Sequence, residues 1–358
     1  MGAVAAATLL VLAACGGAQE EGPGGAAGAT SPGATGSPGG CQSYEEITIG
    51  FPGLPPDFVQ MGLPLAIHRG VLEAYCVRGE LVATESGIAA FRATMAGEFL
   101  FSYSGSVSPI LGKGEGADAV VFMSPAHLLD FQVAALPGYE SCESLRNQPV
   151  ATDGPGGLIH AVMEQFLATC GLDIDRDVRV QIGDPETFPA QLASKAVVAT
   201  ALHVDEKLFT EQEIGIDLVE LGNSWEYAPL FHYASLSAKR SVLEENRDLF
   251  VRISAAILES NRWLVDPANK DRAVAAMAEV SEQPEDVVRQ AYETYGTRFP
   301  TSCDEALNPE AYEFLIDLQV QLGNLEQPYP VEELVDPSVC QDAEQLVAER
   351  EAAGQTVP

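Results

Sequence analysis

The sequence predicts an α/β protein with two lobes, each a mainly parallel sheet with flanking helices, joined by two hinge crossings and followed by a helical C-terminal part. Segments with the apolar patterns of strands and of helices alternate at short intervals from Ile47 to Met123, as in parallel sheets with crossover helices. The same alternation begins again at Pro149, and only helical spacing remains after Arg240. A length of 358 residues also fits about two domains.

The first lobe is expected to contain four strands separated by helices. Its first strand is a β-branched run, and its first helix ends at Gly70, a residue type typical of helix C-termini. The third strand starts at Phe99 and leads through small polar residues into a short helix that ends near Gly112. The other expected elements lie at 47–51, 59–70, 80–84, 87–96 and 119–123.

A second lobe follows an apolar crossing at 131–136 and ends at a return crossing at 230–236. Its expected strands and helices lie at 149–152, 158–170, 178–182, 187–195, 197–202 and 217–221. Helical spacing then marks the segments 242–265, 268–280, 284–295 and 309–322, and the segment 337–351 is either a last turn or a further helix. Because these helices add no new sheet, we expect them to pack back onto the first lobe. The predicted limits are 41–135 for the first part of lobe 1, 136–231 for lobe 2 and 232–358 for the return crossing and C-terminal helices.

The N-terminus predicts export. An apolar run from Ala3 to Ala14 is too short to span a bilayer, which needs about 20 residues, and it has the character of a signal peptide. It ends in Leu12-Ala13-Ala14-Cys15, which resembles a lipobox, so residues 1–15 are expected to be a lipoprotein signal peptide with Cys15 lipidated. Residues 16–40 are rich in Gly, Ala, Pro, Ser and Thr and are expected to form a flexible tether. The alternative is a frayed apolar N-terminus of a cytosolic protein.

The charge excludes two classes of partner. The formal net charge is −33, from 52 Asp and Glu against 19 Lys and Arg. Nucleic acids and anionic lipid surfaces favour basic proteins, so we expect no nucleic-acid partner and contact with the membrane only through the lipid. The net charge does not fix the sign of a local site.

Six further cysteines form an even set, which in an exported chain indicates disulfides. The predicted topology favours pairing in sequence order. Adjacent parallel strands bring their starts together, and this places the cysteines before the first two strands near each other. The pairs are then Cys41–Cys76, Cys142–Cys170 and Cys303–Cys340. A metal site is the alternative, but no C-x-x-C spacing occurs, so we expect neither metal nor cofactor.

Two strand-to-helix turns are the main candidates for a binding site. Ligands of open parallel sheets bind at the carboxyl ends of the strands, where helix N-termini leave backbone N–H groups free. The first turn is Ser104-Gly105-Ser106, and its alternative role is an ordinary helix N-cap. Its counterpart in the second lobe consists of Thr152, Asp153, Gly154, Gly156 and Gly157. Asp153 either accepts a donor from a nitrogenous ligand or caps the following helix.

Other candidates surround these turns. Phe51, Asp57 and Phe58 flank the first loop as a possible cleft wall. Trp225 and Tyr227 precede the return crossing, where aromatic rings serve either as a ligand platform or as core anchors. His203 follows a strand end on the same side as the turns. The remaining histidines are expected to be structural or exposed.

Several short segments, in this order and spacing, carry a family resemblance. They are Ile47-Thr48-Ile49-Gly50-Phe51, Leu65-Ala66-Ile67 with Arg69-Gly70, Ala93 to Glu98 running into Ser104-Gly105-Ser106, Gly116-Ala117-Asp118, Val133 to Gly138 leading to Ser144-Leu145, and Gly154 to Gly157. Together they resemble the extracytoplasmic solute-binding proteins of ABC importers for nitrate, alkanesulfonate and taurine, a family that includes binders of thiamine pyrimidine precursors. The resemblance implies the type II periplasmic-binding-protein fold, a ligand between the lobes, closure by hinge bending, and a membrane permease with its ATPase as partners.

The sequence therefore predicts a lipid-anchored, monomeric substrate-binding protein outside the cytoplasm. Two ligand classes stay open: an oxyanion such as a sulfonate held by the two helix N-termini, or a nitrogenous aromatic held by Asp153, Asp57 and aromatic rings. Neither turn contains an arginine, which disfavours small bare anions such as nitrate.

The alternatives are a surface lipoprotein that senses or binds a ligand without import, and an enzyme of pyrimidine synthesis on the same fold. The chain has no Gly-x-Ser-x-Gly, His-Glu-x-x-His or P-loop motif, and its cysteines are scattered, so we expect no catalysis.

Overall fold

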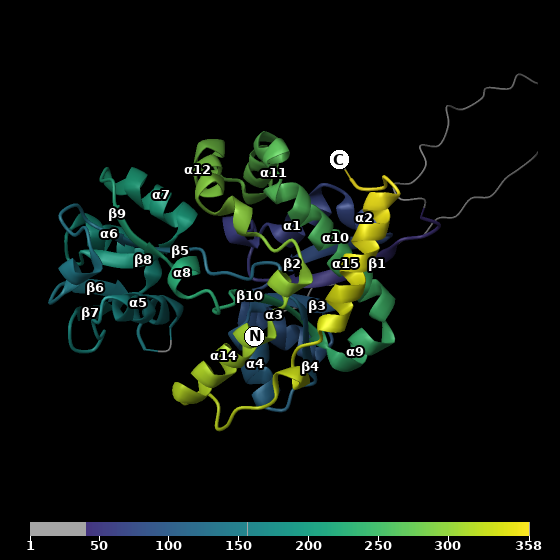
Figure 1. The fold of residues 1–358 in the computed structure, drawn as a ribbon, viewed down its shortest axis with the longest axis horizontal. Coiled ribbons are helices and arrows are strands. Elements are labelled where there is room, and N and C mark those ends of the chain that lie inside the picture. Colours follow the sequence, from purple (N-terminus) through teal and green to yellow (C-terminus); the bar gives the residue numbers. More distant parts are fainter. Residues whose placement is uncertain (1–40, 156, 358) are drawn as a thin grey trace, which may run out of the picture. The chain divides into compact units, whose positions relative to one another are not determined.

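The computed structural model describes residues 41–155 and 157–357 (Figure 1). The predicted signal peptide, Cys15 and the tether lie outside the described residues, as does Gly156. No described helix is both long and apolar enough to cross a membrane.

The first sheet has five strands in the order β2-β1-β3-β10-β4. They are β1 (Glu45–Phe51), β2 (Val77–Ala83), β3 (Phe101–Gly105), β4 (Ala119–Met123) and β10 (Ala234–Lys239). β1 runs parallel to β2 and β3, whereas β10 is antiparallel to both β3 and β4.

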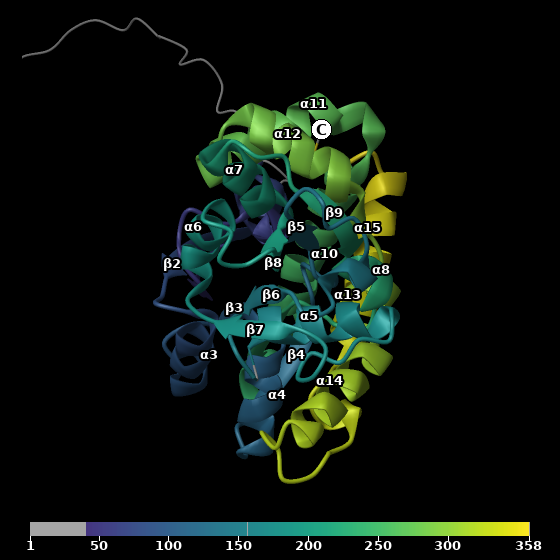
Figure 2. The ribbon, with the colours of Figure 1, turned by 90° about the vertical axis from the view of Figure 1, so that its left-hand side faces the viewer.

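The second sheet repeats this plan with the order β7-β6-β8-β5-β9, which can be followed in Figure 2. Its strands are β5 (Phe131–Ala135), β6 (Pro149–Thr152), β7 (Arg179–Ile182), β8 (Ala199–His203) and β9 (Val219–Asn223). β6 is parallel to β7 and β8, whereas β5 is antiparallel to β8 and β9.

The two crossings supply the antiparallel strands. The segment predicted as the outward crossing, 131–136, is β5 itself, so the chain crosses between the lobes at residues 124–130, before β5, and at residues 228–233, before β10. β5 and β10 each take the fourth place in their sheet. The predicted fold class is confirmed, with each sheet mixed through this one strand. The expected return strand at 230–236 is shifted, because pairing with β3 begins only at Ala234.

Helices cover both sheets. They are α1 (Gly62–His68), α2 (Val71–Ala74), α3 (Gly87–Ala96), α4 (Val107–Gly114), α5 (Leu158–Thr169), α6 (Phe188–Ala193), α7 (Val204–Ile214) and α8 (Ser224–Tyr227). α3 has the predicted bounds because Ser86 accepts a hydrogen bond from the Ala89 N–H at its start and Gly97, with a φ of 92°, ends it. α7 was not predicted, because its acidic residues weaken its amphipathic pattern.

The C-terminal part is helical, as predicted. Its helices are α9 (Arg240–Glu245), α10 (Arg247–Val265), α11 (Lys270–Ser281), α12 (Glu285–Tyr295), α13 (Cys303–Ala306), α14 (Pro309–Gln321) and α15 (Pro337–Ala352). α10 packs against α1, α2 and α15, and α14 packs against α4 (Figure 1). The rings of Phe101, Phe122 and Phe250 join the first sheet to α10, with centroids 4.9 to 6.2 Å apart.

Three disulfides join the described cysteines in sequence order, in the pairs that the topology predicts. Cys41 is bonded to Cys76, Cys142 to Cys170 and Cys303 to Cys340, with Cα–Cα distances of 5.5, 6.1 and 5.6 Å. These distances lie within the normal range for disulfides.

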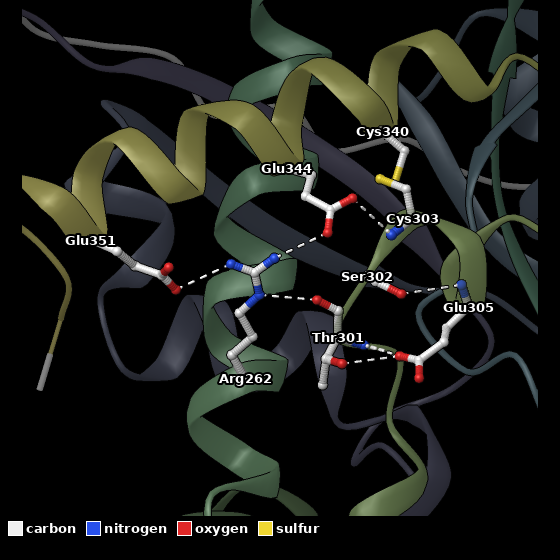
Figure 3. Close-up of polar contacts among 8 residues, drawn as sticks. All are labelled: Arg262, Thr301, Ser302, Cys303, Glu305, Cys340, Glu344 and Glu351. Carbon is white, nitrogen blue, oxygen red and sulfur yellow. Dashed lines mark hydrogen bonds and ion pairs between the residues drawn. A yellow bond between two sulfur atoms is a disulfide. The ribbon is translucent and has the colours of Figure 1, made fainter.

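Arg262 on α10 holds α15 and the start of α13 beside the third disulfide (Figure 3). Its Nε donates to the Thr301 carbonyl at 2.9 Å, and its two terminal nitrogens lie 3.3 and 3.1 Å from the carboxylates of Glu344 and Glu351 on α15. Glu344 also accepts a hydrogen bond from the Cys303 N–H at 3.3 Å. A covalent bond and an ion-pair network therefore fix the same helix.

The covalent bond should contribute more. The double substitution Cys303→Ser, Cys340→Ser opens a loop of 37 residues and should lower the free energy of unfolding by roughly 4 kcal/mol. Arg262→Met should cost about 1 kcal/mol, because its ion pairs are partly exposed. Urea unfolding without reductant measures both values. A loss from Arg262→Met as large as that of the double substitution would contradict this ranking.

Candidate functional site

The end of β3 is not the open turn that the sequence predicts. Ser104 and Gly105 belong to the strand and pair with Ser235 and Ala234 of β10. The Ser106 N–H donates to the Tyr233 carbonyl at 3.1 Å. The expectation of free N–H groups is therefore wrong at Ser106, because the antiparallel return strand extends to this position.

The hydroxyls of this segment differ in their partners. The Ser106 and Ser235 hydroxyls lie 2.8 Å apart, and Ser235 also lies 2.7 Å from the Tyr312 hydroxyl. By contrast, the buried Ser104 hydroxyl has no hydrogen-bond partner among the described residues. The Ser104 hydroxyl is thus available for a further hydrogen bond, whereas the Ser106 hydroxyl is already bonded to Ser235.

In the second lobe, Asp153 caps α5. Its two carboxylate oxygens accept hydrogen bonds from the Ile159 and His160 N–H groups at 3.3 and 2.9 Å. A Cβ on Gly157 would lie 2.2 Å from the Asp153 carboxyl carbon, so only glycine leaves room for this cap. The geometry favours the capping alternative for Asp153.

Thr152 and Gly154 belong to a turn whose polar groups form hydrogen bonds with one another. The buried Thr152 hydroxyl accepts from the Gly154 N–H at 3.2 Å and lies 3.2 Å from His160 Nδ1. The Gly157 N–H donates to the Gly154 carbonyl at 2.9 Å. The N–H groups of Gly154, Gly157, Ile159 and His160 are therefore engaged by the chain itself.

An ion pair lies at the end of the second sheet. His203 ends β8, and Asp130 immediately precedes β5, whose Phe131 is paired with His203. His203 Nδ1 and Asp130 Oδ1 are 2.5 Å apart, and the Phe131 ring lies 3.9 Å from the imidazole. Burial opposes the charge on His203, but the Asp130 carboxylate outweighs it and raises the pKa of the imidazole well above its usual range. Asp130 is fully buried, and its second oxygen, Oδ2, has no partner among the described residues.

Asp57 brings a second carboxylate to this place from the loop after β1. The surrounding protein raises its pKa to about 6, although its side chain keeps contact with solvent. Desolvation is the largest cause. The His203 charge opposes it, and the charges of Asp205, Glu206 and Asp130 add to it. The loop of the first lobe and the acids of the second therefore lie within electrostatic reach of each other.

Two of the predicted wall residues are core residues. Phe51 and Phe58 are 0% and 1% exposed. The Phe51 ring packs 4.9 Å from that of Tyr103, and the Phe58 ring lies 6.3 Å from that of Tyr295. They support two tyrosines whose position in the site was not predicted.

These tyrosines carry polar groups at the same place. The Tyr103 hydroxyl is buried without a partner among the described residues, whereas the Tyr295 hydroxyl donates to the Leu128 carbonyl at 2.9 Å. Tyr233, on the return crossing, has its ring 5.9 Å from the His203 imidazole. Asp57 and Asp130 both raise the pKa of the Tyr103 hydroxyl, after burial as the larger cause.

Trp225 reaches the same group of side chains, but Tyr227 does not join it. The Trp225 ring lies 5.4 Å from that of Tyr295, and its buried Nε1 has no partner among the described residues. The Arg298 guanidinium stands 4.8 Å from the centre of the indole. Tyr227 instead packs against Phe166 in the core of the second lobe.

We call the residues that meet here the junction cluster: Asp57, Tyr103, Asp130, His203, Trp225, Tyr233 and Tyr295. Three of its buried polar atoms, Tyr103 Oη, Asp130 Oδ2 and Trp225 Nε1, have no partner among the described residues. Since buried polar groups are normally paired, such atoms mark a place where a ligand can bind. Within the described residues, no group of three or more His, Cys, Asp or Glu has a geometry that would hold a metal ion.

Three members of the junction cluster, Asp57, His203 and Trp225, are among the residues that the sequence predicts for the site. Asp130 and Tyr233 each lie directly before the strand that follows a crossing, a position that could have drawn attention to them. Tyr295, at the end of α12, has no comparable sequence signal.

Comparison with known proteins confirms the predicted resemblance. The model of the NMT1-like family matches residues 132–278. No curated protein matches the chain in sequence.

Solved structures share the two-lobed fold. The alkanesulfonate-binding protein SsuA from Xanthomonas axonopodis pv. citri, bound to MOPS, has a TM-score of 0.61 at 16% identity, covering 83% of this chain and 99% of that chain. The periplasmic nitrate-binding protein NrtA from Synechocystis PCC 6803 has a TM-score of 0.67 at 13% identity, covering 88% and 91%. A mutant of DszB in complex with biphenyl-2-sulfinic acid has a TM-score of 0.62 at 14% identity, covering 84% and 99%. At these identities the likeness concerns the fold.

The His203–Asp130 pair predicts a pH-dependent stability. A pKa raised by folding contributes stability that is fully present below the unfolded value of about 6.5 and is lost as the pH rises through the folded pKa. Asp130→Asn should therefore lower the free energy of unfolding by about 3 kcal/mol at pH 6 and by clearly less at pH 10. Urea unfolding at both pH values tests this, with the exposed Asp175→Asn as a control. An equal loss at both pH values would disprove the charged pair.

Proposed function

We propose that this chain is the lipid-anchored substrate-binding protein of an ABC importer, which captures a small organic solute at the junction cluster and delivers it to a membrane permease with its ATPase. The observation that carries the proposal is that the junction cluster contains buried polar atoms from both lobes without a partner among the described residues, Tyr103 Oη from the first lobe and Asp130 Oδ2 and Trp225 Nε1 from the second. A ligand that uses all three would hold the lobes together, as hinge closure requires.

The fold supports this proposal. SsuA and NrtA, which have similar folds, bind a sulfonate and nitrate respectively, and NrtA is periplasmic. An extracytoplasmic place also agrees with the three disulfides, which persist in oxidising compartments. The role of Cys15 as the lipidated residue rests on the sequence.

Binding is favoured over catalysis. Every cysteine among the described residues is in a disulfide, so this part of the chain offers no thiolate as a nucleophile or iron ligand. This argues against an enzyme of pyrimidine synthesis that depends on cysteine-bound iron. A lipoprotein that senses a ligand without import is the remaining alternative. Loss of uptake of the bound solute in a strain lacking this chain separates import from sensing.

A matched pair of tyrosine substitutions tests the site. The full chain is screened by thermal shift against sulfonates, pyrimidines, amines and amino acids, since a ligand that binds only the folded state raises the melting temperature. For any hit, Tyr103→Phe should weaken binding about tenfold through loss of one hydrogen bond. Tyr227→Phe removes a hydroxyl that is likewise buried and without a partner among the described residues, but this hydroxyl lies in the core of the second lobe, so the substitution should leave the affinity unchanged. Equal effects would place the site elsewhere, and the absence of any hit would overturn the proposal.

The anchor can be tested independently of the ligand. Cys15→Ala should abolish incorporation of labelled palmitate and move the protein from the membrane fraction to the soluble fraction. Wild-type protein in the same host is the control. A variant that keeps the label or stays with the membrane would disprove lipidation at Cys15.

A further inference from the structure

The charges at the junction cluster bear on the class of ligand, and this inference rests on the proposed function. Four acids lie within reach of one another, Asp57, Asp130, Asp205 and Glu206, and their charges all act on the pKa of Asp57 or His203. Against them stand His203 and Arg298. The balance is negative before any ligand binds.

Both positive groups are already engaged. His203 is paired with Asp130 Oδ1 at 2.5 Å. Arg298 donates to the Thr294 carbonyl at 2.6 Å and stands over the Trp225 ring. His203 is therefore paired with a carboxylate, whereas Arg298 contacts a carbonyl oxygen and an aromatic ring.

Two of the acids are also engaged. Asp205 accepts hydrogen bonds from Gln283 Nε2 at 3.0 Å and from the Glu206 N–H at 3.1 Å. Glu206 accepts from the His203 N–H at 3.1 Å. Two acceptors remain: Asp130 Oδ2, which is buried and has no partner among the described residues, and the carboxylate of Asp57, which is accessible to solvent.

The two helix N-termini that would suit an oxyanion are weakened as sites. Asp153 already places its own carboxylate on the first turn of α5, so the chain supplies the anion that this N-terminus attracts. At α4, the Ser106 N–H is bonded to the Tyr233 carbonyl. An incoming sulfonate would compete with these internal acceptors and would face the two free carboxylates.

Aromatic rings supply the rest of the surroundings. Tyr103, Tyr233, Tyr295 and Trp225 come from β3, the return crossing, α12 and α8. Aromatic faces attract cations, most strongly where water is excluded. Free carboxylate oxygens together with aromatic faces form a cation-binding environment.

We propose that the solute is a small organic cation, a protonated amine or an amidinium on a compact apolar or aromatic body. Its N–H groups donate to Asp130 Oδ2 and to Asp57, and its body lies against the rings of Tyr103, Tyr233 and Trp225. The Tyr103 hydroxyl and Trp225 Nε1 remain available for its polar substituents.

The proposal predicts stronger binding as the pH rises. Asp57 has a pKa of about 6 in the free protein, so below this pH its carboxyl group is largely neutral and attracts a cation less. The groups that act on it are His203, Asp130, Asp205 and Glu206. His203 stays protonated from pH 5 to 8, because its pKa lies above this range. The change in affinity over these pH values therefore follows Asp57.

Matched probes test the sign of the charge. The full chain is titrated by calorimetry and thermal shift with benzamidine, benzamide and benzenesulfonate, and with cyclohexylamine, cyclohexanol and cyclohexanesulfonate. The cation of each set should raise the melting temperature most, with at least fivefold tighter binding at pH 7.5 than at pH 5. Asp57→Asn should lower the affinity for the cationic probe about tenfold and remove this pH dependence. Asp130→Asn should also lower the affinity, and the exposed Asp175→Asn should not.

The outcomes separate the two proposals. If a sulfonate or a neutral probe bound most tightly, and Tyr103→Phe abolished this binding, the inference that the solute is a cation would be wrong. The proposed function would still stand. Cation binding that is insensitive to both Asp57→Asn and Asp130→Asn would also overturn this inference. If neither these probes nor any solute of the wider screen bound, both proposals would fall.

Discussion

The site depends on the way the two crossings enter the sheets. Each crossing leads into an antiparallel strand in the fourth place of a sheet, and the residue directly before that strand joins the junction cluster: Asp130 before β5 and Tyr233 before β10. The outward crossing is also bonded to the start of β10, since the Ser124 hydroxyl donates to the Ala234 carbonyl at 2.6 Å and the Ala234 N–H to the Ala126 carbonyl at 3.1 Å. The backbone pairing of each antiparallel strand therefore also fixes the position of the polar side chain directly before that strand.

The same pairing explains why the Ser106 N–H at the end of β3 is not free. In an all-parallel sheet, Ser104, Gly105 and Ser106 would end beside open N–H groups. Here β10 runs back along β3 and its preceding residue, Tyr233, accepts the Ser106 N–H. At this end of the sheet, the groups still able to bond a ligand are therefore side chains and not the Ser106 N–H. They include the Tyr103 and Ser104 hydroxyls, which have no partner among the described residues.

Local patterns made much of the fold predictable, and non-local contacts limited the prediction of the site. The helix at 87–96 and the strand at 149–152 have the expected bounds because their caps and apolar residues are adjacent in sequence. By contrast, the pairing of β3 with β10 joins residues more than a hundred positions apart, and no pattern near Ser106 signals it. The role of Asp153 could not be predicted for a different reason, since an aspartate that caps a helix and one that binds a ligand have the same sequence context.

The charge of the whole chain and the charge of the site act over different distances. A net charge of −33 attracts cations in general, but salt screens it over about 8 Å at physiological ionic strength. Within the junction cluster the deciding groups are much nearer. His203 neutralises one oxygen of Asp130 at 2.5 Å, and the other, Oδ2, is buried and has no partner in the part of the chain that the structure describes. A buried carboxylate oxygen gains more from a paired donor than a surface acid does, because water does not compensate it. The surface charge can thus speed the arrival of a cation, while Asp130 and Asp57 determine whether it stays.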